Sequence, residues 1–152
     1  MKKVLHVITS LAIGGAERQL AGIVVKLNLK KDFDCSVFAL KTGGYKNRLR
    51  DKGIKTSILN FKSIFKFLIK RCLYFGKYRT DNYDIIQGWM YHGNFLSFII
   101  SKIFFPKSKL IWNIRHTIYD ISHEKILTRI IIKLSCYFSR YVDTIIFNSN
   151  IA

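Results

Sequence analysis

The amino-acid sequence predicts a single α/β domain built on a parallel β-sheet. The chain has 152 residues, of which 49% are hydrophobic, and this is enough to bury one core. Short apolar segments of strand length alternate with longer segments whose apolar residues recur at helical spacing. Proline occurs once and no Gly/Ser-rich linker or internal repeat interrupts the alternation, so a disordered chain is excluded.

The first strand and the first helix are joined by two glycines. Residues 4–8 are a short, partly β-branched apolar run, which indicates a buried strand. After Gly14 and Gly15 the period changes, because apolar residues from Leu20 onward fall at i, i+3, i+4 and i+7. This spacing predicts a helix that opens near Gly15 and closes around Lys30.

The second and third strands flank a short charged helix. Residues 36–40 and 54–59 are the two apolar runs, and Gly53 precedes the second of them. A Gly-Gly turn leads from the first run into a charged segment at 46–52, which we expect to be helical. A long helical pattern follows at 61–78.

Three more strands and two more helices complete the alternation. Pro106 ends the first of these helices, because its ring cannot continue a helix. The expected elements are a strand at 84–87, a helix at 93–105, a strand at 109–114, a helix at 124–141 and a strand at 143–148. Parallel strands need crossover connections, and right-handed crossovers place helices on both faces. The sequence therefore predicts a Rossmann-like parallel sheet with helices on both faces.

The strong positive charge predicts an anionic partner. Lys and Arg number 26 against 9 Asp and Glu, which gives a formal charge of +17. The basic residues are spread along the chain, and no zinc-finger, RNA-binding or basic-zipper pattern appears, so we expect no nucleic-acid partner. An anionic membrane surface and a phosphorylated ligand fit the charge equally well.

Cysteine usage and hydropathy favour a cytoplasmic protein. The three cysteines lie far apart in apolar segments, so neither a disulfide framework nor a metal site is indicated. No apolar run reaches the roughly 20 residues that span a bilayer. No small-residue cleavage site follows the N-terminal apolar stretch, so we expect no signal peptide.

The loop after the first strand can approach a ligand closely. A helix N-terminus presents unpaired N–H groups and partial positive charge, and glycines before it admit a phosphate or a sugar close to the backbone. The alternative is that Gly14 and Gly15 only form a tight turn. Neither the dinucleotide G-x-G-x-x-G pattern nor a Walker A lysine is present, so both of those chemistries are disfavoured.

Motifs along the whole chain carry a resemblance to one enzyme family. They are KVLHVITSLAIGGAERQL, LKTGGYKNRLRDKGIKTSIL, YDIIQGWMYHGNFLSFI, LIWNIRHTI and VDTIIFNSNIA, in that order. Together they resemble the N-terminal, acceptor-side domain of GT-B glycosyltransferases of family four, a retaining class that builds bacterial surface polysaccharides and glycolipids. The resemblance implies a nucleotide-sugar donor, a glycan or lipid-linked acceptor, and neither a metal nor another cofactor. Together with the alternation of strands and helices, it predicts the strand order 3-2-1-4-5-6.

The resemblance assigns roles to the glycine loop. It implies that Gly14 and Gly15 approach the diphosphate of the donor. Glu17 and Arg18 then lie on the first turn, where Glu17 suits the helix dipole and Arg18 can contact an anionic ligand. The alternative for both is an ordinary solvated charge.

The same resemblance implies further site residues after later strands. His116 matches the family histidine that faces the transferred sugar, and it is the expected catalytic residue. His92 and Asn94 are expected in a histidine-bearing loop that lines the acceptor pocket, with a structural role as the alternative. The chain departs from the family at Gln87 and Trp89, where relatives often have histidine.

Two helical segments have both an apolar and a basic side. The segments at 61–78 and 124–141 each carry apolar residues at helical spacing beside lysines or arginines, including Lys62, Lys66 and Lys70 in the first. A core face with a solvated basic flank is the usual interpretation of both segments. The segment at 61–78 has more apolar surface than one core face requires, so docking on anionic lipid is the alternative for this segment.

The resemblance covers one wall of a two-domain cleft. In the family a second domain holds most of the nucleotide-sugar, and no motif of that domain occurs in this sequence. We therefore expect the chain to need a C-terminal domain or a partner chain for transfer. The alternative is a non-catalytic binding module for a phosphorylated or lipid-linked ligand.

Overall fold

The computed structural model describes residues 1–58, 82–115, 121 and 124–147. The helix expected at 61–78 and the expected catalytic residue His116 lie outside these residues. The described chain forms a six-stranded parallel sheet in the order β3-β2-β1-β4-β5-β6, so the predicted order is confirmed. The strands are β1 (Lys2–Ser10), β2 (Phe33–Lys41), β3 (Lys55–Ile58), β4 (Ile85–Trp89), β5 (Lys109–Ile114) and β6 (Thr144–Phe147).

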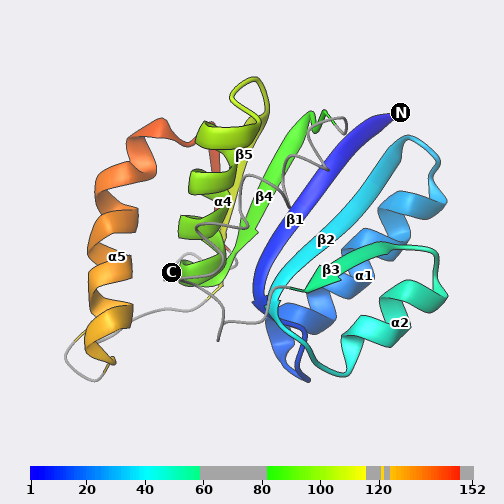
Figure 1. The fold of residues 1–152 in the computed structure, drawn as a ribbon, viewed down its shortest axis with the longest axis horizontal. Helices are drawn as coiled ribbons and strands as arrows, with labels where there is room; N and C mark the ends of the chain where they lie inside the picture. The colour runs from blue at the N-terminus through cyan, green and yellow to red at the C-terminus, as the bar shows by residue number, and fades with distance from the viewer. Residues whose placement is uncertain (59–81, 116–120, 122–123, 148–152) are drawn as a thin grey trace.

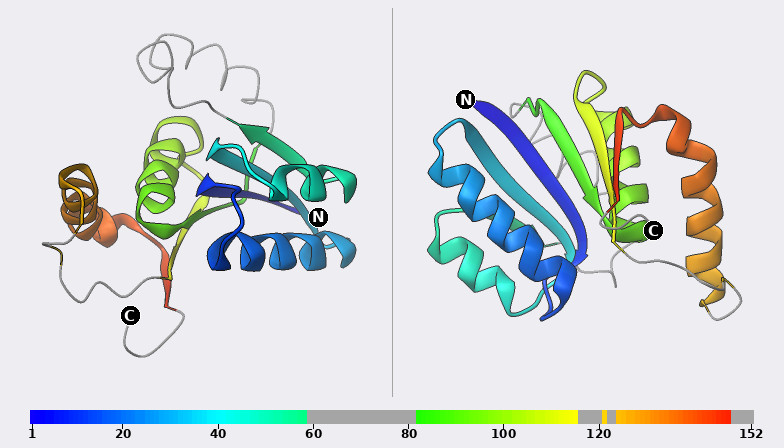
Figure 2. Two further views of the ribbon diagram at one scale, coloured as in Figure 1. Left: turned by 90° about the horizontal axis from the view of Figure 1, so that it is seen from below. Right: turned by 180° about the vertical axis from the view of Figure 1, so that it is seen from behind.

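The described helices cover the sheet in two layers. They are α1 (Gly15–Leu29), α2 (Tyr45–Asp51), α4 (Met90–Phe104) and α5 (Ile126–Phe138), followed by the short 3₁₀ helix η3 (Ser139–Tyr141). α1 and α2 pack on one face of the sheet and α4 packs on the other (Figures 1 and 2). α5 lies beside α4 at the far end of the molecule from α1 and α2 (Figure 1).

Alternation along the central strand builds a core on each face. In β1, Val4 and Ile8 join the cluster beneath α1 and α2, whereas Leu5 and Val7 join the cluster beneath α4. Successive strand residues point to opposite faces, so this buried run supplies both cores. β1 is longer than the expected 4–8, because its polar ends also pair with β2, with Lys2 opposite Phe33 and Ser10 opposite Lys41.

Two glycines allow α4 to lie directly on the sheet. A Cβ atom at Gly93 would stand 2.8 Å from the carbonyl oxygen of Val7 in β1, and one at Gly88 would stand 2.6 Å from the Cα of Asn94. Both distances are shorter than real Cβ contacts, so any larger residue would push the helix away from β1 and β4.

α4 begins three residues earlier than the sequence pattern indicates. Met90, its first residue, has a φ of 63°, a left-handed conformation that costs a non-glycine residue roughly 1–2 kcal/mol. This turn ends β4 abruptly and starts the helix at once. The expectation that His92 stands in a loop is therefore wrong, since His92 lies in the first helical turn.

The apolar face expected on the last helix is only partly a core face. α5 buries Ile132 and Ser135. Ile130 and Leu134, which belong to the apolar residues at helical spacing in 124–141, are exposed. The helix packs on α4 rather than on the sheet, with the rings of Phe98 and Phe138 stacked at a centroid distance of 4.6 Å. One neighbouring helix covers less surface than a sheet would, so much of the stripe meets solvent.

Within the described residues, no helix is long and apolar enough to cross a membrane. No group of three or more His, Cys, Asp or Glu side chains there is arranged to hold a metal ion. Cys35 is buried and Cys136 is exposed, and both are free thiols.

The core contains one buried histidine in the middle of β1. His6 is fully buried, and its Nδ1 accepts a hydrogen bond from Nε1 of Trp89 at 3.3 Å. This acceptor role requires a neutral ring with its proton on Nε2. Burial lowers the pKa of His6 from 6.5 to about 4, because the charged imidazolium would lose its hydration.

The depressed pKa of His6 predicts a loss of stability in acid. Between about pH 6.5 and pH 4 the unfolded chain binds a proton that the folded chain does not, so the free energy of unfolding falls as the pH falls through this window. The full loss is about 3 kcal/mol. Urea unfolding at a series of pH values measures it.

His6→Gln is the control for this prediction, because the amide keeps an acceptor for Trp89 and does not titrate. The variant is expected to show a shallower decline in unfolding free energy across the same pH window. Equal slopes for the two proteins would show that His6 does not carry the effect.

Candidate functional site

The candidate site lies at the carboxyl edge of the sheet, at β1, where the order of the strands reverses. β1 stands between β2 and β4, and its crossover helix α1 covers one face while α4 covers the other. The first turns of α1 and α4 both open at this edge (Figure 1). In open parallel sheets such a reversal leaves a crevice between the loops, and ligands bind there.

The glycine loop presents the first amides of α1. Gly14 is the N-cap residue and has extended backbone angles, and no side chain caps the helix. The N–H groups of the first turn therefore have no partner within the helix. Apart from its chain neighbours and the backbone of α1, no atom of the described residues lies within 4 Å of the position that a Cβ at Gly15 would take, so the space beside this residue is open.

A second glycine turn supports the first. A Cβ at Gly43 would overlap the carbonyl of Leu11, so the turn after β2 can lie against the loop after β1 only because Gly43 has no side chain. Backbone hydrogen bonds tie the two loops together: Leu11 N–H donates to the Lys41 carbonyl at 3.2 Å, and Tyr45 N–H donates to the Leu11 carbonyl at 3.0 Å. The turn at Gly43 thus fixes the position of the loop after β1.

Glu17 and Arg18, the charged residues of the first turn of α1, differ in their burial. Glu17 is half-buried, and its carboxyl group folds back beside Gly14, with its Cδ 3.2 Å from the position of a Cβ there. A carboxylate at this point complements the helix dipole, as the sequence indicated, and it also occupies space beside the open amides. Arg18 is exposed on the same turn.

His92 lies among charges from two other elements. It is half-buried in the first turn of α4, and burial lowers its pKa. The carboxylate of Glu124 acts in the opposite direction, and the ammonium of Lys41 at the end of β2 lowers the pKa further. His92 therefore favours the neutral ring, which can donate one hydrogen bond and accept another.

Asn94 is turned away from the surface. It is 1% exposed, its Nδ2 donates to the Asn113 carbonyl at 3.4 Å, and its Oδ1 accepts from the Asn113 N–H at 3.3 Å. Both ends of the amide thus hold α4 against β5. This corrects the expectation that Asn94 lines the acceptor pocket, and the sequence's structural alternative holds.

Arg115 is a site residue that the sequence reasoning did not select. It follows β5 directly, and its guanidinium carbon lies 5.0 Å from the centre of the Trp89 ring at the end of β4. Its Nε is buried and has no hydrogen-bond partner among the described residues, and desolvation lowers the pKa of Arg115. The sequence signal for Arg115 was a basic residue at the carboxyl end of a strand in a parallel sheet. Lys41, the last residue of β2, carries the same signal.

The structure brings part of the expected site together. The loop that carries Gly14 and Gly15 is tied to Lys41 by the backbone hydrogen bond from Leu11. The charge of Lys41 in turn lowers the pKa of His92. Arg115 follows β5, which lies two strands from β1 in the sheet, and its guanidinium lies over the ring of Trp89. One described hollow, of about 630 Å³, is lined by Lys2, Tyr83, Pro106 and their neighbours at the opposite edge, so it is not part of this site.

The fold matches solved structures of GT-B glycosyltransferases. HepE from Anabaena, in complex with UDP and glucose, has a TM-score of 0.70 and 21% identity, and the match covers 98% of this chain and 38% of HepE. MurG from Acinetobacter baumannii has a TM-score of 0.61 and 14% identity, over 100% of this chain and 43% of MurG. Sucrose-phosphate synthase from Thermosynechococcus elongatus has a TM-score of 0.57 and 11% identity, over 97% of this chain and 47% of that enzyme.

At these identities the likeness is one of fold, and it confirms the predicted Rossmann-like α/β architecture. The chain spans less than half the length of each of these structures. No family model matches the chain, and no curated protein matches its sequence.

The contact beneath the glycine loop predicts unequal effects of two alanine substitutions. Gly43→Ala forces a methyl group into the backbone at Leu11, and we expect it to lower the free energy of unfolding by about 1–3 kcal/mol. Gly15→Ala places the same methyl group in open space and should change stability by less than about 0.5 kcal/mol. Urea unfolding measures both variants, and equal effects would contradict the described loop contact.

Proposed function

We propose that this chain is the acceptor-side domain of a retaining, metal-independent glycosyltransferase of family four. It would help to transfer a sugar from a nucleotide-sugar to a lipid-linked glycan acceptor, in the synthesis of bacterial surface polysaccharide or glycolipid. The supporting fold comparison includes a structure that holds UDP and glucose. The enzyme would work at the cytoplasmic face of the cell membrane, where such acceptors are found.

One observation carries the proposal. The open amides at Gly14 and Gly15 stand at the point of strand-order reversal, in a fold that matches GT-B enzymes over nearly the whole chain. A diphosphate needs this combination of backbone donors, positive dipole and free space.

Basic side chains around the loop would complete an anion site. Lys41 and Arg115 stand at the ends of two strands and Arg18 stands on the first turn of α1, so the developing charge on a leaving diphosphate would meet cations from several directions. The Glu17 carboxylate would have to swing away from Gly14, because two negative groups cannot share the same amides.

The histidines would contact sugars rather than phosphate. A neutral His92 at the edge can donate to a hydroxyl of the acceptor while its other ring nitrogen accepts. His116, two residues after the end of β5, is the proposed partner of the transferred sugar, in line with the family resemblance.

The proposal includes a second wall for the donor. This chain spans 38% of HepE and 43% of MurG, so a matching C-terminal domain, in the same polypeptide or as a partner chain, would hold most of the nucleotide-sugar. The 152-residue chain by itself is therefore expected to transfer no sugar. A non-catalytic module that only binds a phosphorylated or lipid-linked ligand is the alternative.

Gly15→Val tests the proposed role of the glycine loop. In a protein that combines this chain with its matching second domain, a branched side chain at Gly15 would keep a diphosphate from the amides. Transfer from a nucleotide-sugar should fall on the order of 100-fold, the loss typical of a deleted catalytic hydrogen bond. His116→Ala is expected to cause a loss of the same order.

Gly22→Val is the matched control. Gly22 lies on the same helix with no atom within 4 Å of its Cβ position, so the variant carries the same helix cost away from the edge and should retain transfer. Transfer by the isolated chain at ordinary enzyme rates would overturn the need for a second domain. Equal activity of Gly15→Val and Gly22→Val would overturn the loop assignment, and binding without any transfer would favour the alternative.

A further inference from the structure

The exposed side of α5 is an apolar stripe with a basic flank. Six large side chains on α5 and η3 are each between 37% and 73% exposed. They are Ile126, Leu127, Ile130, Leu134, Tyr137 and Tyr141. At 100° per residue these positions fall within about one third of the helix circumference, and we call them the α5 stripe.

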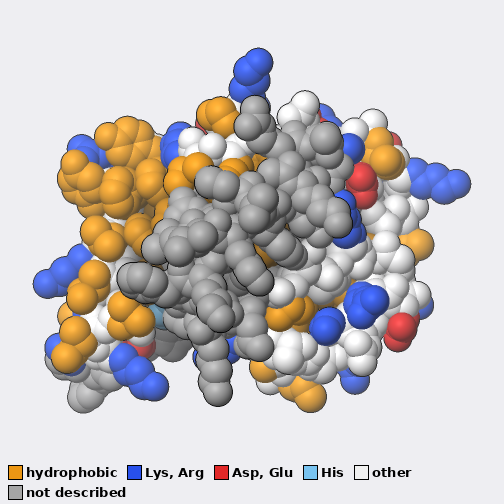
Figure 3. Space-filling view, in the orientation of Figure 1, with side chains coloured by type: hydrophobic (Ala, Val, Ile, Leu, Met, Phe, Trp, Pro, Cys, Tyr) orange, Lys and Arg blue, Asp and Glu red, His pale blue; other side chains and the backbone are white. Residues whose placement is uncertain are grey.

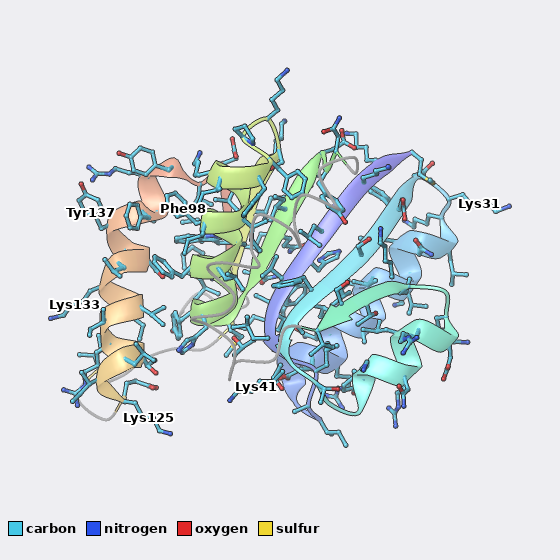
Figure 4. All side chains as sticks on the ribbon, viewed as in Figure 1. Lys31, Lys41, Phe98, Lys125, Lys133 and Tyr137 are labelled. Carbon is cyan, nitrogen blue, oxygen red and sulfur yellow. The ribbon has the colours of Figure 1, made fainter. Side chains whose placement is uncertain are left out.

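A row of basic residues runs beside the α5 stripe. Lys125, Arg129, Lys133 and Arg140 recur at the same spacing, and residues 125–142 contain no Asp or Glu. Figure 4 shows Lys133 and Tyr137 projecting from α5 away from the sheet, with Lys125 at the start of the helix. In Figure 3 hydrophobic side chains gather over this end of the molecule with Lys and Arg around them.

We propose that the α5 stripe and its basic flank dock the protein on an anionic phospholipid surface. A helix that lies in a membrane interface needs apolar side chains to insert among the acyl chains and cations to meet the headgroup phosphates. The α5 stripe supplies the first and the basic row supplies the second.

The aromatic end of the stripe suits the same partner. Tyr137 and Tyr141 place an apolar ring and a polar hydroxyl at the boundary, as aromatic residues do at membrane interfaces. The guanidinium of Arg140 lies 3.9 Å from the centre of the Tyr137 ring, so a cation is already fixed beside the ring.

Charge argues against a second copy of the chain as the occupant. Two α5 stripes packed together would bring two basic rows into contact, with no acidic residue between 125 and 142 to neutralise them. An anionic lipid surface has the complementary charge, and the formal charge of +17 adds long-range attraction.

The inference depends on the proposed function only for its purpose, which is to bring the domain to a lipid-linked acceptor. Vesicle binding needs neither donor nor acceptor, so it succeeds or fails independently of sugar transfer.

The 152-residue chain is mixed with vesicles of phosphatidylcholine alone or with added phosphatidylglycerol, and the bound fraction is measured by flotation. Binding is expected on the anionic vesicles, should weaken with salt, and should be low on the neutral ones.

Two matched pairs of variants locate the surface. Lys125→Gln with Lys133→Gln should weaken binding about fivefold per lysine, whereas Lys26→Gln with Lys52→Gln, at the far end of the molecule, should not. Ile126→Ser should weaken binding roughly tenfold, because one inserted aliphatic side chain is lost. Leu29→Ser is its control, since Leu29 is 75% exposed and Ile126 is 73% exposed.

Three results would overturn the proposal. The first is equal binding of the chain to neutral and anionic vesicles. The second is unchanged vesicle binding by both α5 variants, with loss of binding in Lys62→Glu, Lys66→Glu and Lys70→Glu together, which would place the contact in residues 61–78 instead. The third is a dimer in analytical ultracentrifugation that Ile126→Ser dissociates, which would make the α5 stripe an interface between two copies.

Discussion

The close contact of α4 with β1 and β4 is the constraint on which the rest of the structure depends. Gly88 and Gly93 leave no room for a Cβ, so the helix axis is fixed at backbone distance from the sheet. The left-handed turn at Met90 then sets where α4 begins, and with it the position of His92 at the carboxyl edge. α5 packs on α4, so its placement follows from the same contact.

Polar groups inside this frame tie the strands together at the reversal of strand order. Asn94 joins α4 to β5 through both ends of its amide, and His6 joins β1 to the indole of Trp89. The guanidinium of Arg115 lies over the ring of the same indole. Buried polar groups are costly unless paired, so the two hydrogen bonds of the Asn94 amide fix α4 on β5 more tightly than apolar packing alone. A site assembled at this edge starts from preorganised strands.

Periodicity predicted the layers of this fold better than it predicted exposure. The alternation of strands and helices follows from local apolar patterns, and the strand order was predicted from this alternation together with the family resemblance. The start of α4 could not be read in advance, because a methionine gives no sequence signal for the left-handed conformation that Met90 adopts. The burial of Asn94 and the stacking of Arg115 depend on residues of other strands. The exposure of Ile130 and Leu134 depends on α5 packing against one helix instead of a sheet.

The geometry of α5 links the two proposed surfaces. α5 begins on the side of the carboxyl edge that lies beyond α4, at the far end from α1, and runs away from this edge along the side of the molecule (Figure 1). Its 13 residues are about 20 Å long. A membrane that accepts the α5 stripe along this length would therefore bring its headgroup layer to the side of the edge that carries Glu124 and His92, where the Glu124 carboxylate acts to raise the pKa of His92. A lipid-linked glycan extends from that layer into water, so the acceptor would enter the site from the α5 side while the glycine loop meets the donor from the α1 side. Under the proposed function, the two substrates would then enter from opposite ends of one sheet edge and meet between them.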